Sequence, residues 1–131
     1  MITSTRHDPL RIAIAGVGNC ASALVQGLHA YAQTGAADGL MHSSISGLTC
    51  SDIVIVAAFD IDDRKVGRPL GEALAAPPNC AARFWPHPLP ETTIVSMGPV
   101  LDGVAPHMAE YPDHLAFRIA DRKPVDLARL L

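Results

Sequence analysis

Two glycines near the start of the chain, Gly16 and Gly18, stand where an apolar run gives way to a helical pattern. Gly16 would let the backbone turn sharply, and Gly18 has no side chain to keep an anionic group away from the main chain. The amides of Gly18, Asn19 and Cys20 would then lie at a helix amino terminus, which favours negative charge. Asn19 could in addition cap that helix. The stretch therefore predicts a backbone site for a phosphate or diphosphate.

Two further residues extend this pattern to the fingerprint of dinucleotide-binding turns. Ala21 occupies its third small position, and Asp60 follows the next apolar run, where a carboxylate would accept hydrogen bonds from ribose hydroxyls. The distance from Gly18 to Asp60 is roughly twice the usual spacing of about 20 residues, because a Gly- and Ser-rich segment, 35–51, intervenes. A carboxylate there favours NAD over NADP, since it would repel a 2′-phosphate. A tight strand-to-helix bend beside a solvated aspartate remains the alternative. The candidate cofactor-binding residues are Gly16, Val17, Gly18, Asn19, Cys20, Asp60 and Ile61.

The elements that would position these residues follow from the hydrophobic pattern. The run 10–15 predicts a first strand, and apolar residues at helical spacing from Asn19 predict a helix that ends near Gly35 or Gly39. The second strand, 53–59, is apolar at every position, which is typical of a parallel strand covered on both faces.

The second half of the chain gives weaker signals. We expect a helix over 63–76, a Pro-rich connector over 79–90 and a short third strand over 92–96. A broken helix over 101–111 and the start of a helix at 125 complete the pattern, with 112–123 ambiguous.

Alternation of strands and helices implies right-handed parallel crossovers, and 131 residues suffice for one domain. We therefore expect a single domain, 1–131, with an α/β fold: a partial Rossmann-like parallel sheet with crossover helices.

Composition excludes several other classes of protein. The net charge of −3, with 10 scattered Lys and Arg, gives no basic surface for nucleic acid. No apolar run reaches the ~18 residues of a membrane span, and the first residues do not have a signal-peptide layout. Three cysteines without a Cys-x-x-Cys pair indicate free thiols and a cytoplasmic protein, and the histidine spacing indicates no metal site. We also identify no catalytic residue.

Four stretches together resemble the bacterial and archaeal inositol-3-phosphate synthases, also called myo-inositol-1-phosphate synthases. They are GVGNCASALVQGL (16–28), GLMH (39–42), VAAFDIDDRKVG (56–67) and GPVLDG (98–103). The resemblance covers about 10–131 and departs from the family pattern at Pro69, at Asn79–Ala81 and at Met97.

The resemblance implies an NAD-dependent isomerase that converts glucose 6-phosphate to inositol 3-phosphate and forms homo-oligomers. It implies that Gly16, Gly18, Asn19 and Cys20 form the phosphate loop and that Asp60 binds the adenosine ribose. Family members are much longer, and their catalytic residues lie outside the matched part. We therefore expect these residues to bind NAD without catalysis.

A second function is also compatible with the sequence. The dinucleotide-binding order places strand one in the middle of the sheet, with further strands beyond it. Without them, 10–15 would be an edge strand with unpaired backbone groups. The alternative is therefore a non-catalytic interaction or regulatory subunit. It would pair through this edge with a second copy or with a partner chain that completes the sheet.

Overall fold

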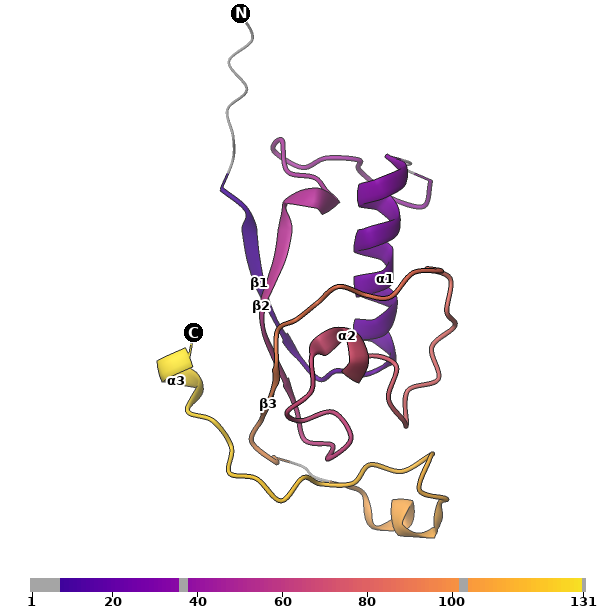
Figure 1. The fold of residues 1–131 in the computed structure, drawn as a ribbon, viewed down its shortest axis with the longest axis vertical. Helices are drawn as coiled ribbons and strands as arrows, with labels where there is room; N and C mark the ends of the chain where they lie inside the picture. The colour runs from indigo at the N-terminus through magenta and orange to yellow at the C-terminus, as the bar shows by residue number, and fades with distance from the viewer. Residues whose placement is uncertain (1–7, 36–37, 102–103, 131) are drawn as a thin grey trace, which may run out of the picture.

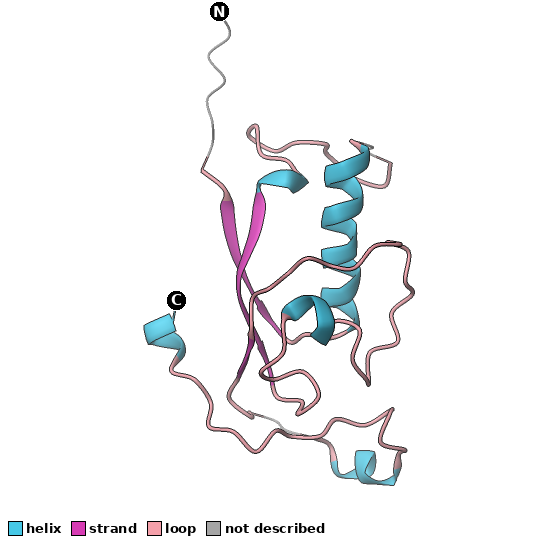
Figure 2. Cartoon of the chain, in the orientation of Figure 1, coloured by secondary structure: helices cyan, strands magenta, loops and turns pink. Residues whose placement is uncertain are grey.

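The computed structural model describes residues 8–35, 38–101 and 104–130, and these contain one three-stranded parallel sheet. The strands are β1 (Leu10–Ala15), β2 (Ile53–Asp60) and β3 (Val95–Met97), in the order β1-β2-β3. Both pairs of neighbouring strands run parallel. The expected partial α/β sheet is thus confirmed (Figures 1 and 2). Within the described residues β1 pairs with β2 alone, so it is an edge strand.

Two helices lie on one side of the sheet. α1 (Asn19–Thr34) runs alongside the strands, and the short α2 (Leu70–Ala73) lies near its amino-terminal end (Figure 1). α1 ends as expected, because Gly35 adopts a left-handed conformation and its N–H bonds back to the Tyr31 carbonyl. The main core fills the space between helices and sheet. Its fully or nearly fully buried residues are Ile14, Val17, Ala21, Val25, Ala58, Leu70, Ala73, Leu74 and Val95.

β2 is buried on both faces only in its carboxyl-terminal half, so the prediction for the whole strand was wrong. Ala57 to Asp60 are buried, whereas Val54 and Val56 are exposed. The register with β1 shifts beside Val56, where one extra residue of β2 is accommodated as a bulge. The buried half is the half that carries Asp60.

The helix expected over 63–76 is reduced to the four residues of α2. Gly67 has a φ of 86° and Pro69 is extended, with φ −56° and ψ 140°, so neither continues a helix. Residues before Gly67 form turns instead. The prediction failed because this turn, like the first one, needs the left-handed conformation that glycine allows.

The third strand begins later than the expected range 92–96. Val95, the first residue of β3, pairs with β2 on one side and with the turn that precedes α2 on the other. The amide of Val95 donates to the Arg68 carbonyl at 2.9 Å, and the amide of Gly67 donates to the Val95 carbonyl at 2.8 Å. These two hydrogen bonds fix the turn before α2 against the start of β3.

The C-terminal part is mostly irregular: it passes below the ends of the strands, and its last segment with α3 lies on the opposite side of the strands from α1 (Figure 1). The expected broken helix over 101–111 is a 3₁₀-helix at Pro106–Glu110, and the last described helix is α3 (Leu127–Leu130). The segment 112–123 contacts the sheet end through a bridge between Ile119 and Asp62. No helix in the described ranges is long and apolar enough to cross a membrane.

Candidate functional site

The glycine turn connects β1 to α1 at the carboxyl end of the sheet. Gly16 has a φ of 91°, and its amide donates to the Phe59 carbonyl at 2.8 Å, which ties the turn to β2. A Cβ atom placed on Gly16 or on Gly18 would meet no heavy atom within 4 Å. The turn is therefore open on the side where a ligand could approach the main chain.

The amino terminus of α1 has free amide groups at this turn. Gly18 is the N-cap, and no side chain caps the helix. The amide of Ser22 donates to the Gly18 carbonyl at 3.0 Å, whereas those of Gly18, Asn19 and Cys20 have no protein acceptor among the described residues. These three donors and the dipole of a 16-residue helix suit an anion.

Asp60 lies beside the turn, as its position after the second strand predicts. Its Oδ2 accepts the Val17 amide at 2.7 Å, and its Oδ1 accepts the amides of Ile61 and Asp62 at 2.8 and 2.9 Å. The carboxylate is buried and fixed, yet each oxygen has two lone pairs, so Oδ2 retains room for a further donor.

Asn19 does not cap α1, and that prediction was wrong. It is the first residue of α1, and its Oδ1 accepts the amides of Cys80 and Ala81 at 2.7 and 2.8 Å. The side chain therefore fixes the connector after α2 against the glycine turn. Cys20, beside it, is an exposed free thiol.

Two residues that are not among the candidate cofactor-binding residues, Lys65 and Asn79, lie directly behind the turn. Lys65 is fully buried, and its Nζ donates to the Val17 carbonyl and to Asn79 Oδ1, both at 2.8 Å. Asn79 Nδ2 donates to the same Val17 carbonyl at 3.0 Å. Burial lowers the pKa of Lys65, although Asp60 and Asp62 act against this shift. Only the position of Lys65 shortly after Asp60 hinted at such a role.

A cavity of about 440 Å³ opens at the carboxyl ends of the strands, next to the turn. Gly16, Asp60 and Ile61 line it on one side, and Gly98 follows β3. The remaining lining is apolar and comes from Ala15, Phe59, Pro99, Leu101, Phe117 and Leu127. One carboxylate in an otherwise apolar wall suits a flat ring attached to a hydroxylated sugar.

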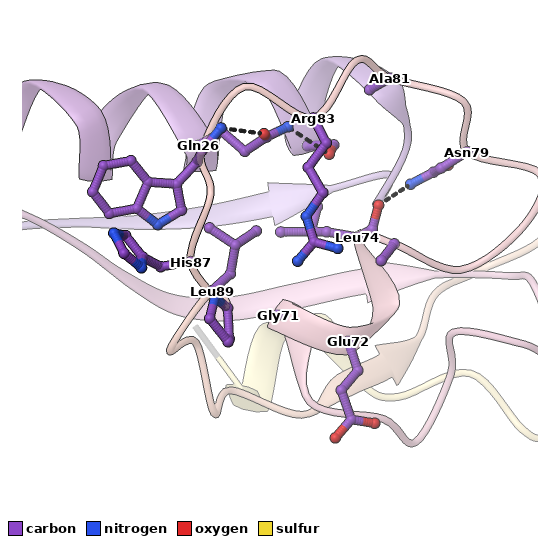
Figure 3. A pocket seen from close by; sticks show the side chains of 13 residues that line it. Gln26, Gly71, Glu72, Leu74, Asn79, Ala81, Arg83, His87 and Leu89 are labelled. Carbon is purple, nitrogen blue, oxygen red and sulfur yellow. Dashed lines mark hydrogen bonds between the residues drawn. The ribbon is translucent and has the colours of Figure 1, made fainter.

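A second cavity of about 440 Å³ lies between α1, α2 and the connector 79–89. Figure 3 shows Arg83 reaching into it over Leu74, with His87 at the far end, and Trp85 also lines it. Glu72 points away from the other labelled side chains (Figure 3). This cavity is lined by none of the candidate cofactor-binding residues.

Known proteins share both sequence and fold with this chain. It is 39% identical over 131 residues to an inositol-3-phosphate synthase of Mycolicibacterium smegmatis. This match covers 98% of this chain and 34% of the synthase. The synthases of Corynebacterium glutamicum and Mycobacterium tuberculosis are 39% and 38% identical, over 100% and 93% of this chain. The chain spans about a third of the length of these relatives. No protein-family model matches the sequence.

Two solved structures resemble the fold. The crystal structure of Ari2 has a TM-score of 0.61 and 36% identity, covering 70% of this chain and 29% of Ari2. A myo-inositol-1-phosphate synthase-related protein from Thermotoga maritima has a TM-score of 0.53 at 22% identity, covering 69% and 22% of the two chains. The second likeness concerns the fold alone.

Proposed function

Because the chain is homologous to part of the inositol-3-phosphate synthases, we propose that it binds NAD at the glycine turn. The diphosphate would lie on the amides of Gly18, Asn19 and Cys20, and the adenosine would enter the apolar cavity beside Asp60. When bound, NAD would supply hydride transfer. The residues of this chain bind and orient it.

The open backbone of the turn is the observation that supports this proposal best. Phosphate oxygens need close approach to the main chain, and no atom fills the space over Gly16 or Gly18. Asp60 adds a buried acceptor at the edge of the adjoining cavity. Val17 and Ile61 serve through their backbone amides, which fix the Asp60 carboxylate.

The substitution Gly18→Val tests this assignment. The φ of Gly18 is −96°, which any residue adopts, and a Cβ there has free space, so the variant should fold like the wild type. Its branched side chain would occupy the place of the diphosphate. We expect calorimetric titration with NAD to show binding by the wild type and at least about a hundredfold weaker binding by the variant.

Gly27→Ala is the matched control, since Gly27 lies in α1 away from the turn and its Cβ would only touch the Tyr31 ring at 4.0 Å. Equal NAD affinity in Gly18→Val and the wild type would refute the diphosphate site.

We assign the described residues to cofactor binding and none of them to catalysis of the synthase reaction. A longer protein, or a partner, would provide the catalytic residues. Formation of inositol phosphate from glucose 6-phosphate and NAD by this chain alone would contradict that assignment.

One observation favours the second candidate function, an interaction or regulatory subunit. β1 pairs on one side only within the described residues, and Leu10 and Ala13 are exposed along it. A strand from a second copy or from another protein could extend the sheet there. The two functions use different parts of the sheet, so each has its own test.

A further inference from the structure

The peptide between Val17 and Gly18 is held from inside the protein by two donors. Its carbonyl oxygen accepts Lys65 Nζ at 2.8 Å and Asn79 Nδ2 at 3.0 Å. The two donors are themselves joined, because Lys65 Nζ also donates to Asn79 Oδ1 at 2.8 Å. The carbonyl therefore points into the interior, towards a fully buried ammonium group.

The orientation of this carbonyl fixes the direction of the amide that follows. The peptide is trans, so its N–H and C=O point in opposite directions. The Gly18 N–H must then point out of the interior, towards the open side of the turn. Glycine offers little steric resistance to rotation of the peptide plane, and a flipped peptide would present a carbonyl oxygen to the diphosphate. Rotation would remove one acceptor from the buried Lys65 ammonium and one from the half-buried Asn79 amide, which would keep only Asn79 Oδ1 and the Leu74 carbonyl, respectively.

We propose that Lys65 and Asn79 are positioning residues for the diphosphate: they lock the Val17–Gly18 peptide with its N–H outward. Lys65 adds a positive charge directly behind the turn. This inference rests on the proposed NAD site and concerns how the site recognises phosphate. Neither side chain touches the ligand, because both bind the opposite side of the peptide.

The charges around Lys65 show how pH acts on this arrangement. Asp60, on β2, places Oδ2 at 4.0 Å from Nζ, while Asp62 and Arg64 belong to the same turn as Lys65. Asn79, from the connector, is uncharged. Burial lowers the pKa of Lys65, so its proton is lost at a lower pH than that of an exposed lysine. Above that pH the turn loses its positive charge, and affinity for a phosphate ligand should fall.

The test compares a ligand that carries phosphate with one that does not. ADP and adenosine would be titrated into the full chain by calorimetry, with ligand-observed NMR for weak binding. For Lys65→Met we expect about tenfold weaker ADP binding and less than about twofold change for adenosine. For Asn79→Leu, which keeps the ammonium, we expect a smaller loss for ADP only. Arg68→Met is the matched control, because it removes one exposed positive charge from the same turn.

The pH profile of the wild type gives a second measurement that does not depend on a folded variant. As the pH rises towards 10.5, the ordinary pKa of a lysine, ADP affinity should already fall in the wild type, because burial lowers the pKa of Lys65, and adenosine affinity should not. A flat ADP profile would overturn the proposal.

The remaining outcomes separate this inference from the proposed function. If the wild type binds NAD and Lys65→Met binds ADP equally well, the positioning role is wrong and the NAD site stands. If ADP and adenosine lose affinity equally, Lys65 is merely structural. If the wild type binds none of these ligands, the proposed function itself is wrong, and this inference with it.

Discussion

Two buried carboxylates, two residues apart, have different partners at the end of β2. Asp60 accepts only backbone amides, from Val17, Ile61 and Asp62. Asp62 instead binds the guanidinium of Arg64, with Oδ1 at 2.8 Å from Nε and Oδ2 at 2.6 Å from Nη2. The charge of Asp62 is thus neutralised by Arg64, whereas Asp60, with Oδ2 at 4.0 Å from Lys65 Nζ, remains the acceptor at the cavity wall.

The stability of the fold should depend on the charge of Asp62. Burial acts to raise the pKa of Asp62, but hydrogen bonds from Arg64 and Arg118 outweigh it and hold the pKa below the usual 3.8. Asp62→Asn would place an amide donor against the donors of Arg64. We expect a loss of about 3 kcal/mol in unfolding free energy at neutral pH, measured by urea denaturation.

The difference in unfolding free energy between the wild type and Asp62→Asn should depend on pH. Because the folded pKa is depressed, the carboxylate stabilises the fold fully above the unfolded value of 3.8 and less as pH falls through the folded value. The gap between wild type and Asp62→Asn should therefore narrow only below about pH 4. Asp63→Asn, at a neighbouring exposed carboxylate, should cost less than about 1 kcal/mol. A pH-independent gap would show that the charge is not what stabilises the fold.

Sequence reasoning located Asp60 but not Lys65, and the difference is physical. A carboxylate after a buried strand follows from chain order alone, because parallel strands end at one edge of the sheet. A fully buried lysine follows from no periodicity, since lysine is usually exposed. Its role depends on turns over 63–67 that bring its side chain under Val17.

At the scale of elements, one face of α1 holds the connector after α2. Asn19, Ser22 and Gln26 share this face at helical spacing, and Ser22 and Gln26 are buried although polar. Gln26 Oε1 accepts the amides of Phe84 and Trp85 at 3.0 and 3.1 Å, and its Nε2 donates to the Ala82 carbonyl at 3.2 Å. An extended segment without a helix or strand of its own thus obtains its hydrogen bonds from a helix.

Removal of these bonds should release the connector. In Gln26→Leu, two backbone amides would lose their acceptor, at a cost of about 2 kcal/mol. Trp85 is the only tryptophan of the sequence, and it is buried against His29 with ring centroids 6.0 Å apart. Its fluorescence should therefore shift to longer wavelength in the folded variant. Gln33→Leu, an exposed position on α1, should leave the spectrum unchanged. An unshifted spectrum in Gln26→Leu would mean that packing alone holds the connector.

The elements themselves were predictable to different degrees. β1 follows from a short apolar run and α1 from apolar residues at helical spacing, and both elements occur where expected. The helix over 63–76 was overestimated because apolar residues at helical spacing do not show that Gly67 and Pro69 redirect the backbone. The start of β3 was misplaced because Thr93, inside the expected range, binds the first residue of α2 through its carbonyl instead of joining the ladder with β2, a contact between segments far apart in sequence.

At the scale of the whole molecule, all parts of the candidate site lie at the carboxyl ends of the three strands. Hydrogen bonds from Gly16 to Phe59, at 2.8 Å, and from Gly98 to Asp60, at 3.0 Å, connect the ends of the three strands. The C-terminal part contributes Phe117 and Leu127 to the cavity there, which the sequence did not predict because that part has no regular pattern. The candidate site thus draws on residues from most of the described chain, while β1 takes part in it only at its carboxyl end.

The open edge of β1 yields a prediction about assembly. Strand edges with unpaired backbone groups pair readily, and a lysine on the edge opposes such pairing. If β1 joins a second copy, sedimentation velocity should show a mean mass that rises with concentration. Ala13→Lys, at an exposed position in β1, should weaken this association at least about tenfold and leave NAD affinity unchanged.

The comparison with Ala32→Lys identifies the surface involved. Ala32 is exposed on α1, so this variant adds the same charge away from the strand edge and should associate like the wild type. A wild type that stays monomeric at every concentration would exclude self-association through β1. Association that Ala13→Lys and Ala32→Lys both leave intact would place the interface elsewhere.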